Sequence, residues 1–259
     1  MFTRSRAFLL LLAALVAVGL PTLGQSSKAD SESEILLAID RLLFLNTMHG
    51  SYAETLEITL SDPDGTSHRS VVELLLSIDG ENYRALLRTL EPETSAGTSH
   101  LILEDESVYL CTPDLAMPMQ VSGSTDLFGD SSITTTAGIS YSVDFVLEDM
   151  TQEESDAGPL LRLELTAASE AFPYPQATLW VQPFTYVPTR CTLYSLSGDA
   201  LVEIEYAEFG IQGEDNYLIH QRVRGLLGSE TTTDLRVLDL SNKPIAPEVF
   251  DLDHFCVKE

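Results

Sequence analysis

Strict alternation of apolar and polar residues constrains this chain more than any other feature. Segments 55–60, 161–165 and 202–206 each place apolar side chains at every second position, with Thr, Arg or Glu between them. Successive side chains of a strand point to opposite faces, so each segment has one apolar face and one polar face. This pattern predicts an antiparallel sheet that is covered on one side only.

Turn residues separate these segments along most of the chain. The sequence Asp62-Pro63-Asp64-Gly65 lies between alternating segments 56–60 and 72–78, which predicts a long hairpin. Similar turn residues recur at 105–106, 197–199 and 213–216. We therefore expect a mainly β (α+β) fold, a meander of about 10–12 strands.

One helix is expected ahead of the strands. Ser31 and Glu34 have the spacing of a capping box, and apolar residues at helical spacing follow them. The pattern predicts a helix from about Glu32 to Leu45. Its wide apolar stripe must be buried, because a helix of this length is marginal in water.

The segment from Thr112 to Tyr141 breaks the rhythm of the strands. It is rich in Pro, Gly, Ser and Thr, and a loop this long within a domain is usually functional or partly helical. We expect a mobile lid here. Its scattered apolar residues, the candidate lid contacts, are Met117, Met119, Leu127 and Phe128.

The first 24 residues are typical of a secretory signal peptide. Arg4 and Arg6 precede an apolar run at 7–20, and Thr22 and Gly24 have the small side chains of a cleavage site. The alternative, a retained anchor helix, is less favoured because spanning a bilayer takes about 20 apolar residues. We expect residues 25–259 to form one exported, soluble domain. Gln25 stands where a bacterial lipoprotein has its lipid-bearing Cys, so no lipid anchor is expected.

Charge and cysteine content narrow the choice of partner and chemistry. The chain has 40 acidic and 14 basic residues, a net charge of −26, which argues against nucleic acid as a partner. Three cysteines allow at most one intramolecular disulfide, and their spacing leaves the pairing open. Cys111 and Cys191 equally suit small apolar core positions.

No pattern of residues indicates catalysis. The chain has no nucleophile elbow, phosphate-binding loop or dinucleotide fingerprint. The five histidines, which are His49, His68, His100, His220 and His254, lack the close pairing of metal ligands. We expect no enzymatic activity, no cofactor and no metal.

Several short motifs occur in an order that resembles the LolA-like outer-membrane lipoprotein-sorting proteins. The motifs are Ser33-Glu34-Ile35-Leu36, Asp64-Gly65, Val108-Tyr109-Leu110 before Pro113, Phe128-Gly129-Asp130-Ser131, Leu179-Trp180-Val181, Tyr186-Val187-Pro188 and Val249-Phe250. Together they cover most of the chain after residue 25. The chain departs from the family pattern at 117–124, which carries no charge, and in the order of Asp130 and Ser131.

This resemblance implies an incomplete antiparallel β-barrel around an apolar cavity, with the N-terminal helix and a loop or helix as lid. It implies a soluble periplasmic carrier that shelters acyl chains of lipoproteins or lipids on their way to the outer membrane. Its further partners would be an inner-membrane release complex and an outer-membrane acceptor. The alternative is a periplasmic sensor that uses the same fold to bind lipid and regulate a partner.

The residue pattern independently favours a cavity. One helix and a loop supply few side chains to cover the apolar side of ten or more strands. The enclosed space can therefore stay partly unfilled. For each predicted residue the alternative is an ordinary position in a filled core. The predicted lining is Leu56, Ile58, Leu74, Leu76, Leu161, Leu163, Val181, Leu193, Val202, Ile204 and Ile219.

Overall fold

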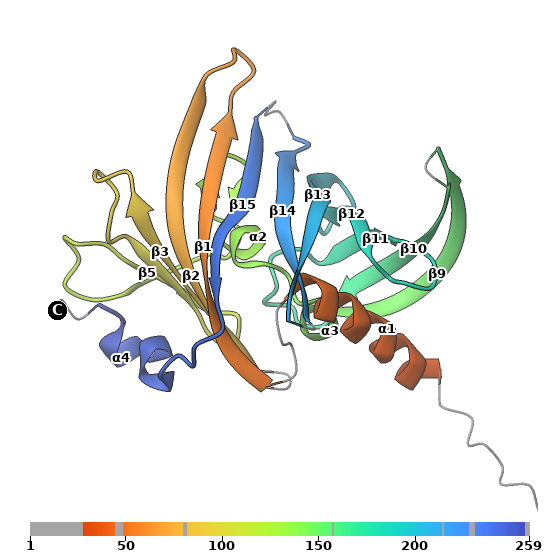
Figure 1. Cartoon of the computed structure of the whole chain (residues 1–259), viewed down its shortest axis with the longest axis horizontal. Helices are drawn as coiled ribbons and strands as arrows, with labels where there is room; N and C mark the ends of the chain where they lie inside the picture. The colour runs from red at the N-terminus through yellow and green to blue at the C-terminus, as the bar shows by residue number, and fades with distance from the viewer. Residues whose placement is uncertain are drawn as a thin grey trace, which may run out of the picture.

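The computed structural model describes residues 28–44, 49–79, 82–156, 158–213, 215–227 and 231–256. The expected signal peptide and its cleavage site lie outside these residues. Within them, one antiparallel sheet of 13 strands bends around its own concave face, and a second sheet has two short strands (Figure 1). None of the described helices is both long and apolar enough to cross a bilayer.

The elements follow one another in a simple order. The helices are α1 (Lys28–Leu43), α2 (Ile133–Ala137), α3 (Tyr141–Asp144), η1 (Pro247–Phe250) and α4 (Leu252–Phe255). The strands of the first half are β1 (His49–Ser61), β2 (Ser67–Asp79), β3 (Asn82–Glu91), β4 (Ser99–Ile102), β5 (Val108–Cys111), β6 (Met119–Val121), β7 (Asp126–Phe128) and β8 (Ser131–Ser132). Those of the second half are β9 (Phe145–Ser155), β10 (Gly158–Ala167), β11 (Gln176–Val181), β12 (Pro188–Tyr194), β13 (Ala200–Gln212), β14 (Asp215–Gly225) and β15 (Thr232–Ser241).

The large sheet consists of two meanders joined by the last strand. One meander runs from β1 to β6 and the other from β9 to β14, and β15 lies between β1 and β14. The register pairs Ile58 of β1 with Leu235 of β15, and Gln221 of β14 with the same Leu235. Strands far apart in the sequence therefore meet at this junction.

The predicted fold class is confirmed at the level of a mainly β, antiparallel structure. The hairpin at 62–65 is present, because Ser61 pairs with Ser67 and Gly65 turns the chain at a φ of 88°. The strands number 15 in the described residues rather than 10–12. The additional ones are mostly the short strands β6, β7 and β8, which lie within the segment that we expected to be a loop.

The predicted helix is present but begins earlier than its capping box. It starts at Lys28, so Ser31 lies inside α1. Strand β9 runs on through residues 148–155, which are polar except for Met150. Since β9 is an edge strand that pairs only with β10, most of these positions are exposed, and they carry charges that discourage pairing between molecules.

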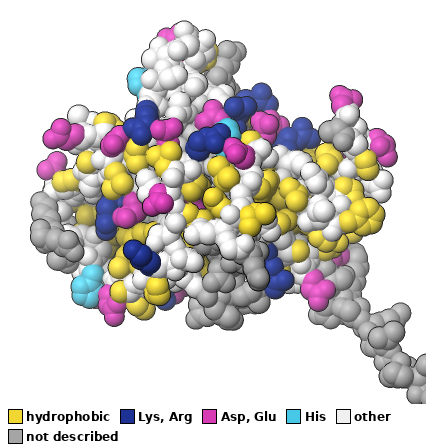
Figure 2. Space-filling view, in the orientation of Figure 1, with side chains coloured by type: hydrophobic (Ala, Val, Ile, Leu, Met, Phe, Trp, Pro, Cys, Tyr) yellow, Lys and Arg dark blue, Asp and Glu magenta, His cyan; other side chains and the backbone are white. Residues whose placement is uncertain are grey.

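The concave face carries the main hydrophobic core. Leu36, Ile39 and Leu43 of α1 are buried against the inward side chains of the sheet, together with Ile133 and Ala137 of α2. Helix α1 contacts α3, β9 and β14. The outer face of β13–β15 carries cross-strand ion pairs such as Arg224–Glu203 at 2.7 Å, and Figure 2 shows acidic and basic side chains side by side on this face.

The prediction of a sheet covered on one side only is wrong for β2–β4. Leu75, Leu86 and Leu101 point away from the concave face, yet each is at most 9% exposed. The C-terminal segment with η1 and α4 lies over them and buries Phe250 there (Figure 1). A disulfide between Cys111 and Cys256 attaches this segment to β5, while Cys191 is a free, buried thiol.

A buried carboxylate attaches α1 to the rest of the molecule. Asp40 of α1 is 2% exposed and accepts hydrogen bonds from the backbone N–H groups of Tyr141 and Ser142, both at 2.8 Å. The hydroxyls of Ser140 and Ser142 donate to it at 3.0 and 2.5 Å. Burial raises the pKa of Asp40 to about 6, although the hydrogen bonds from Ser142, Tyr141 and Ser140 act in the opposite direction.

We expect Asp40→Asn to lower the free energy of unfolding by about 2 kcal/mol. The NH₂ group of asparagine cannot accept a hydrogen bond, so some of the N–H and O–H groups that donate to Asp40 would lose their acceptor. Urea unfolding at neutral pH measures this change. The matched control is Glu34→Gln, which removes an exposed carboxylate from the same helix and should have little effect. Equal stability of the two variants would contradict the anchoring role of Asp40.

Candidate functional site

The concave face is incompletely filled at the junction of the two meanders. A cavity with a free volume of about 50 Å³ lies between the end of α1, the α2 segment and the sheet. It is lined by Leu43, Phe44, Tyr52, Glu54, Leu56, Leu74, Leu76, Thr135, Thr136, Ala137, Gly138, Ile139, Ile204, Tyr206, Leu218, Ile219, Gln221, Leu235 and Val237. The cavity is smaller than the roughly 150 Å³ that holds one benzene molecule. An acyl chain therefore fits only if the cover moves.

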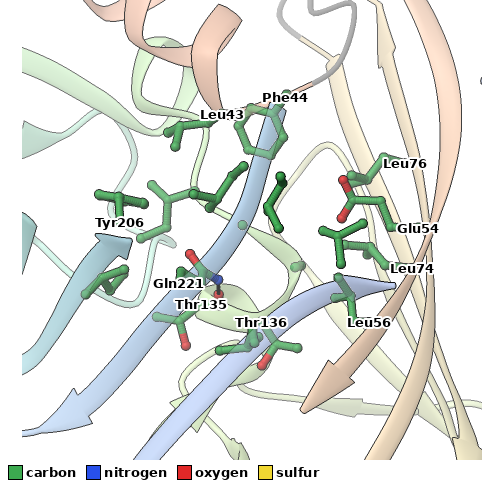
Figure 3. A pocket seen from close by; sticks show the side chains of 18 of the residues that line it. Leu43, Phe44, Glu54, Leu56, Leu74, Leu76, Thr135, Thr136, Tyr206 and Gln221 are labelled. Carbon is green, nitrogen blue, oxygen red and sulfur yellow. Dashed lines mark hydrogen bonds between the residues drawn. The ribbon is translucent and has the colours of Figure 1, made fainter. Parts of the chain in front are cut away.

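Two short segments form that cover. Leu43 and Phe44 come from the end of α1, and residues 135–139 come from α2 and the chain that follows it (Figure 3). Gly138 has a φ of 95°, and a Cβ atom built on it would lie 2.9 Å from the Phe44 ring. The absent side chain thus lets the Phe44 ring lie directly on the backbone after α2.

A few polar contacts hold α2 against the sheet. The Tyr83 hydroxyl donates to the carbonyl oxygen of Ala137 at 2.9 Å. Nε2 of Gln221 donates to the carbonyl oxygen of Thr135 at 3.2 Å, and the Tyr174 hydroxyl donates to Ser132 Oγ at 2.9 Å. Each such hydrogen bond contributes about 1 kcal/mol net. This part of the cover is therefore attached by modest, separable interactions.

Helix α3 connects the end of α1 to strand β13. Its Tyr141 is fully buried and shares a 2.5 Å hydrogen bond with the hydroxyl of Tyr206, one of the residues that line the cavity. Because Asp40 binds the start of α3, the end of α1, α3 and β13 form one connected unit. The position of Phe44 over the cavity depends on this connection.

Glu54 is the one acidic side chain in the cavity wall. It lies on β1 opposite Leu74 of β2, and only 8% of it is exposed. Figure 3 shows its carboxyl beside Leu76, among the side chains that surround the cavity. In the described parts of the chain it makes no hydrogen bond or ion pair, and burial raises its pKa to about 8.

The structure divides the predicted lining residues into two groups. Leu56, Leu74, Leu76, Ile204 and Ile219 line the cavity. The others belong to the packed wall of the concave face: Ile58, Leu163, Val181, Leu193 and Val202 are buried, and Leu161 is partly buried. Whether either group contacts a lipid stays a prediction.

The predicted lid residues lie elsewhere on the segment from 112 to 141. Met117 and Met119 are 75% and 49% exposed, and Met119 lies on the edge strand β6. Leu127 and Phe128 on β7 pack partly buried against the core. None of the four lines the cavity, whereas residues 135–139 of the same segment do.

Sequence reasoning missed the cavity residues of the α1 and α2 segments and several on the strands, namely Tyr52, Glu54, Tyr206, Leu218, Gln221, Leu235 and Val237. Glu54 could have been recognised from the sequence as an unusual inward residue. It shares the inward positions of β1 with Tyr52, Leu56 and Ile58 and is the only acidic residue among them. Residues 135–139 gave no such signal, because a five-residue helix has too few turns to show a period.

Within the described ranges, no three His, Cys, Asp or Glu side chains are grouped so that they could hold a metal ion. The buried thiol of Cys191 lies in the main core, and burial raises its pKa to about 12. Cys191 therefore behaves as a small apolar core residue, one of the two roles that the sequence allowed.

We expect the free energy of unfolding of the wild type to depend on the ionisation of Glu54. The variant Glu54→Gln should lack this contribution to the pH dependence. The pKa of Glu54 is about 8 in the fold against 4.5 for a free side chain, so the unfolded state binds fewer protons between these values. Stability of the wild type then falls as pH rises from about 5 to 8. We expect the stability of Glu54→Gln relative to wild type to rise by roughly 3–5 kcal/mol over that range. Urea unfolding at several pH values tests this, and a constant difference would contradict it.

Known structures share this fold over almost their whole length. A LolA superfamily protein from Nitrosomonas europaea matches with a TM-score of 0.77 and 21% identity, covering 86% of this chain and 98% of that one. A domain described as an outer membrane lipoprotein-sorting protein, from Vibrio parahaemolyticus, matches with a TM-score of 0.72 and 16% identity, covering 87% and 98%. A DUF1329 family protein from Desulfovibrio piger matches with a TM-score of 0.71 and 14% identity, covering 86% and 97%.

The sequence itself matches one family model, described as "Uncharacterized protein", over residues 81–255. No curated protein matches the sequence of this chain. The match covers more than half of the chain and includes every strand from β4 to β15. The chain therefore belongs to the family of uncharacterized proteins that this model describes, and its fold is the LolA-like fold.

Proposed function

We propose that this protein is a soluble periplasmic carrier that shelters acyl chains of lipoproteins or lipids and delivers them towards the outer membrane. The observation that carries the proposal is the cavity itself, which has largely apolar walls and lies under a cover of two short segments. The fold shared with a structure described as a lipoprotein-sorting domain supports the same function. No catalytic step is part of the proposal.

Opening of the cover is a necessary part of this function. The free volume of about 50 Å³ is too small for a chain, so the guest takes the space of the Phe44 ring and of residues 135–139. Burying ten methylene groups contributes about 8 kcal/mol, since each contributes about 0.8 kcal/mol. The hydrogen bonds that hold α2 contribute about 1 kcal/mol each, so a guest of this length can offset their loss.

Export supports the assignment to the periplasm. The charged start, the short apolar run and the small residues before Gln25 are those of a signal peptide. A carrier that works between two membranes must itself be released from the first one. N-terminal sequencing of the mature protein from the periplasm of an expressing cell tests this step, and we expect the chain to begin at Gln25.

We expect mass spectrometry of the native wild-type protein to show co-purified lipid, and Leu76→Glu to reduce it at least tenfold. The new carboxylate lies in the apolar wall, where a charge without a partner is strongly unfavourable. The matched control is Leu238→Glu, which puts the same charge at a side chain that is 50% exposed and should retain the lipid.

Because Leu76→Glu also stresses the core, a second variant fills the cavity without adding charge. Ile219→Phe enlarges a half-buried side chain of the cavity wall and should reduce bound lipid while the protein stays folded. A wild type without lipid, or two folded variants that carry as much lipid as the wild type, would refute the carrier.

Transfer separates a carrier from a sensor that only binds. We expect the loaded protein to pass a labelled acyl cargo to acceptor vesicles within a reaction that contains no other protein. Fluorescence dequenching of the cargo in the vesicles measures this transfer. Cargo that is bound but never released would favour the sensor instead.

A further inference from the structure

The carboxyl of Glu54 is unusual among buried acids in this fold. Acidic side chains are almost never fully buried unless they are paired, because an isolated charge is costly in an apolar environment. Asp40 follows this rule and accepts four hydrogen bonds. Glu54 is 8% exposed and has no partner in the described residues. A structural role gives no reason for the chain to place a carboxyl here.

The surroundings of Glu54 make it the free polar group of the cavity. The neighbouring side chains on β1 and β2 are Tyr52, Leu56, Leu74 and Leu76. The leucines supply no hydrogen-bond donor, and no hydrogen bond joins the Tyr52 hydroxyl to the carboxyl, so the occupant of the cavity is the partner that we expect for Glu54. Figure 3 shows the carboxyl within the ring of side chains that surrounds this space.

Four other polar side chains of the wall already make hydrogen bonds, and one of them is Tyr206, whose hydroxyl is bonded to that of Tyr141. Gln221 donates to the carbonyl oxygen of Thr135 across the cavity floor. The hydroxyls of Thr135 and Thr136 donate to the carbonyl oxygen of Ser132, at 3.2 and 2.8 Å. Among the described residues, the wall contains no Lys, Arg or His. The cavity therefore offers one ionisable carboxyl and no cation among the described residues.

A carboxyl group in a wall without cations favours guests whose head group is positively charged. An anionic group such as a carboxylate or phosphate would find no positive charge in this wall to pair with, and it would be repelled by Glu54 wherever Glu54 is ionised. An ammonium group would pair with the carboxylate and donate hydrogen bonds to it. A net charge of −26 also attracts cationic guests to the protein as a whole.

We propose that this cavity binds apolar chains that carry an amine, with the ammonium group paired to the Glu54 carboxylate. This inference rests on the proposed carrier function and specifies the chemical class of its guest. The proton balance is simple. A neutral carboxyl and an ammonium group become a carboxylate–ammonium pair, and one proton passes to the solvent. Because the pKa of Glu54 is about 8 without a guest, most of the protein at pH 7 carries the proton that is released.

The test compares three guests with the same twelve-carbon chain, bound to delipidated full-length protein below their micellar concentrations. The guests are dodecylamine, dodecanol and dodecanoate. Isothermal titration calorimetry should show that dodecylamine binds the wild type at least tenfold more tightly than dodecanol, and dodecanoate most weakly. Titrations in buffers of different ionisation enthalpy should show close to one proton released per dodecylamine at pH 7.

Glu54→Gln is the diagnostic variant. It should weaken dodecylamine binding at least tenfold, abolish proton release and leave dodecanol binding unchanged. The matched control is Glu57→Gln on the same strand, which removes an outer carboxylate that pairs with Arg69 at 2.5 Å. That control should bind dodecylamine like the wild type.

The outcomes separate this inference from the carrier function. Equal affinity of the wild type for all three guests, with no proton released, would refute the amine and leave the carrier standing. Equal weakening of dodecylamine by both variants would also refute it, because the effect would then come from the overall negative charge. Failure of all three guests to bind the wild type would refute both proposals. Proton release by the wild type needs no variant, so the test holds even if Glu54→Gln does not fold.

Discussion

The attachment of α1 to α3 through Asp40 determines how the concave face of the sheet is covered. A curved sheet with an apolar inner face is stable only when something else in the chain hides that face from water. Here the main helix does so, and the carboxylate of Asp40 sets its position by accepting hydrogen bonds from Ser140, Tyr141 and Ser142. Tyr141 extends the connection to Tyr206 on β13. The end of α1, and with it Phe44, is thereby held over the junction of the two meanders.

The remaining cavity is a consequence of how little material covers the sheet. Helix α1 packs over β9 and β14, and α2 has only five residues, so the space near β1 and β2 receives few side chains. The outer face of β2–β4, in contrast, is well covered. The C-terminal segment buries it, and a disulfide attaches that segment to β5. One half of the sheet is thus supported from outside, where a guest in the concave face would press against it. That support lies on the outer side, whereas the inner side of β1 and β2 faces the cavity.

Two buried carboxyl groups, those of Asp40 and Glu54, differ in whether the chain itself supplies their hydrogen-bond partners. Asp40 is satisfied by the chain itself and holds the fold together. Glu54 is also buried but makes no hydrogen bond or ion pair among the described residues, and it raises the free energy of the folded protein wherever it is ionised. In the proposed complex with an amine, the same carboxylate would be paired.

The sequence by itself determined the local features of this protein. Alternation at 55–60 and 202–206 predicted strands because side chains of a strand alternate between faces, and Asp62 to Gly65 predicted the turn between β1 and β2. The order of motifs indicated a LolA-like fold, and five of the eleven predicted lining residues do line the cavity. These features depend on neighbouring residues or on the face of one strand.

Only the tertiary structure decided which inward residues enclose free space. Leu163 and Leu76 have the same alternation pattern, yet Leu163 is buried away from the cavity and Leu76 lines it. The insertion of β15 between β1 and β14 and the pairing of Cys111 with Cys256 join segments that are distant in the chain. No local pattern records such contacts. The missing partner of Glu54 could be recognised only once the packing of β1 against its neighbours was known.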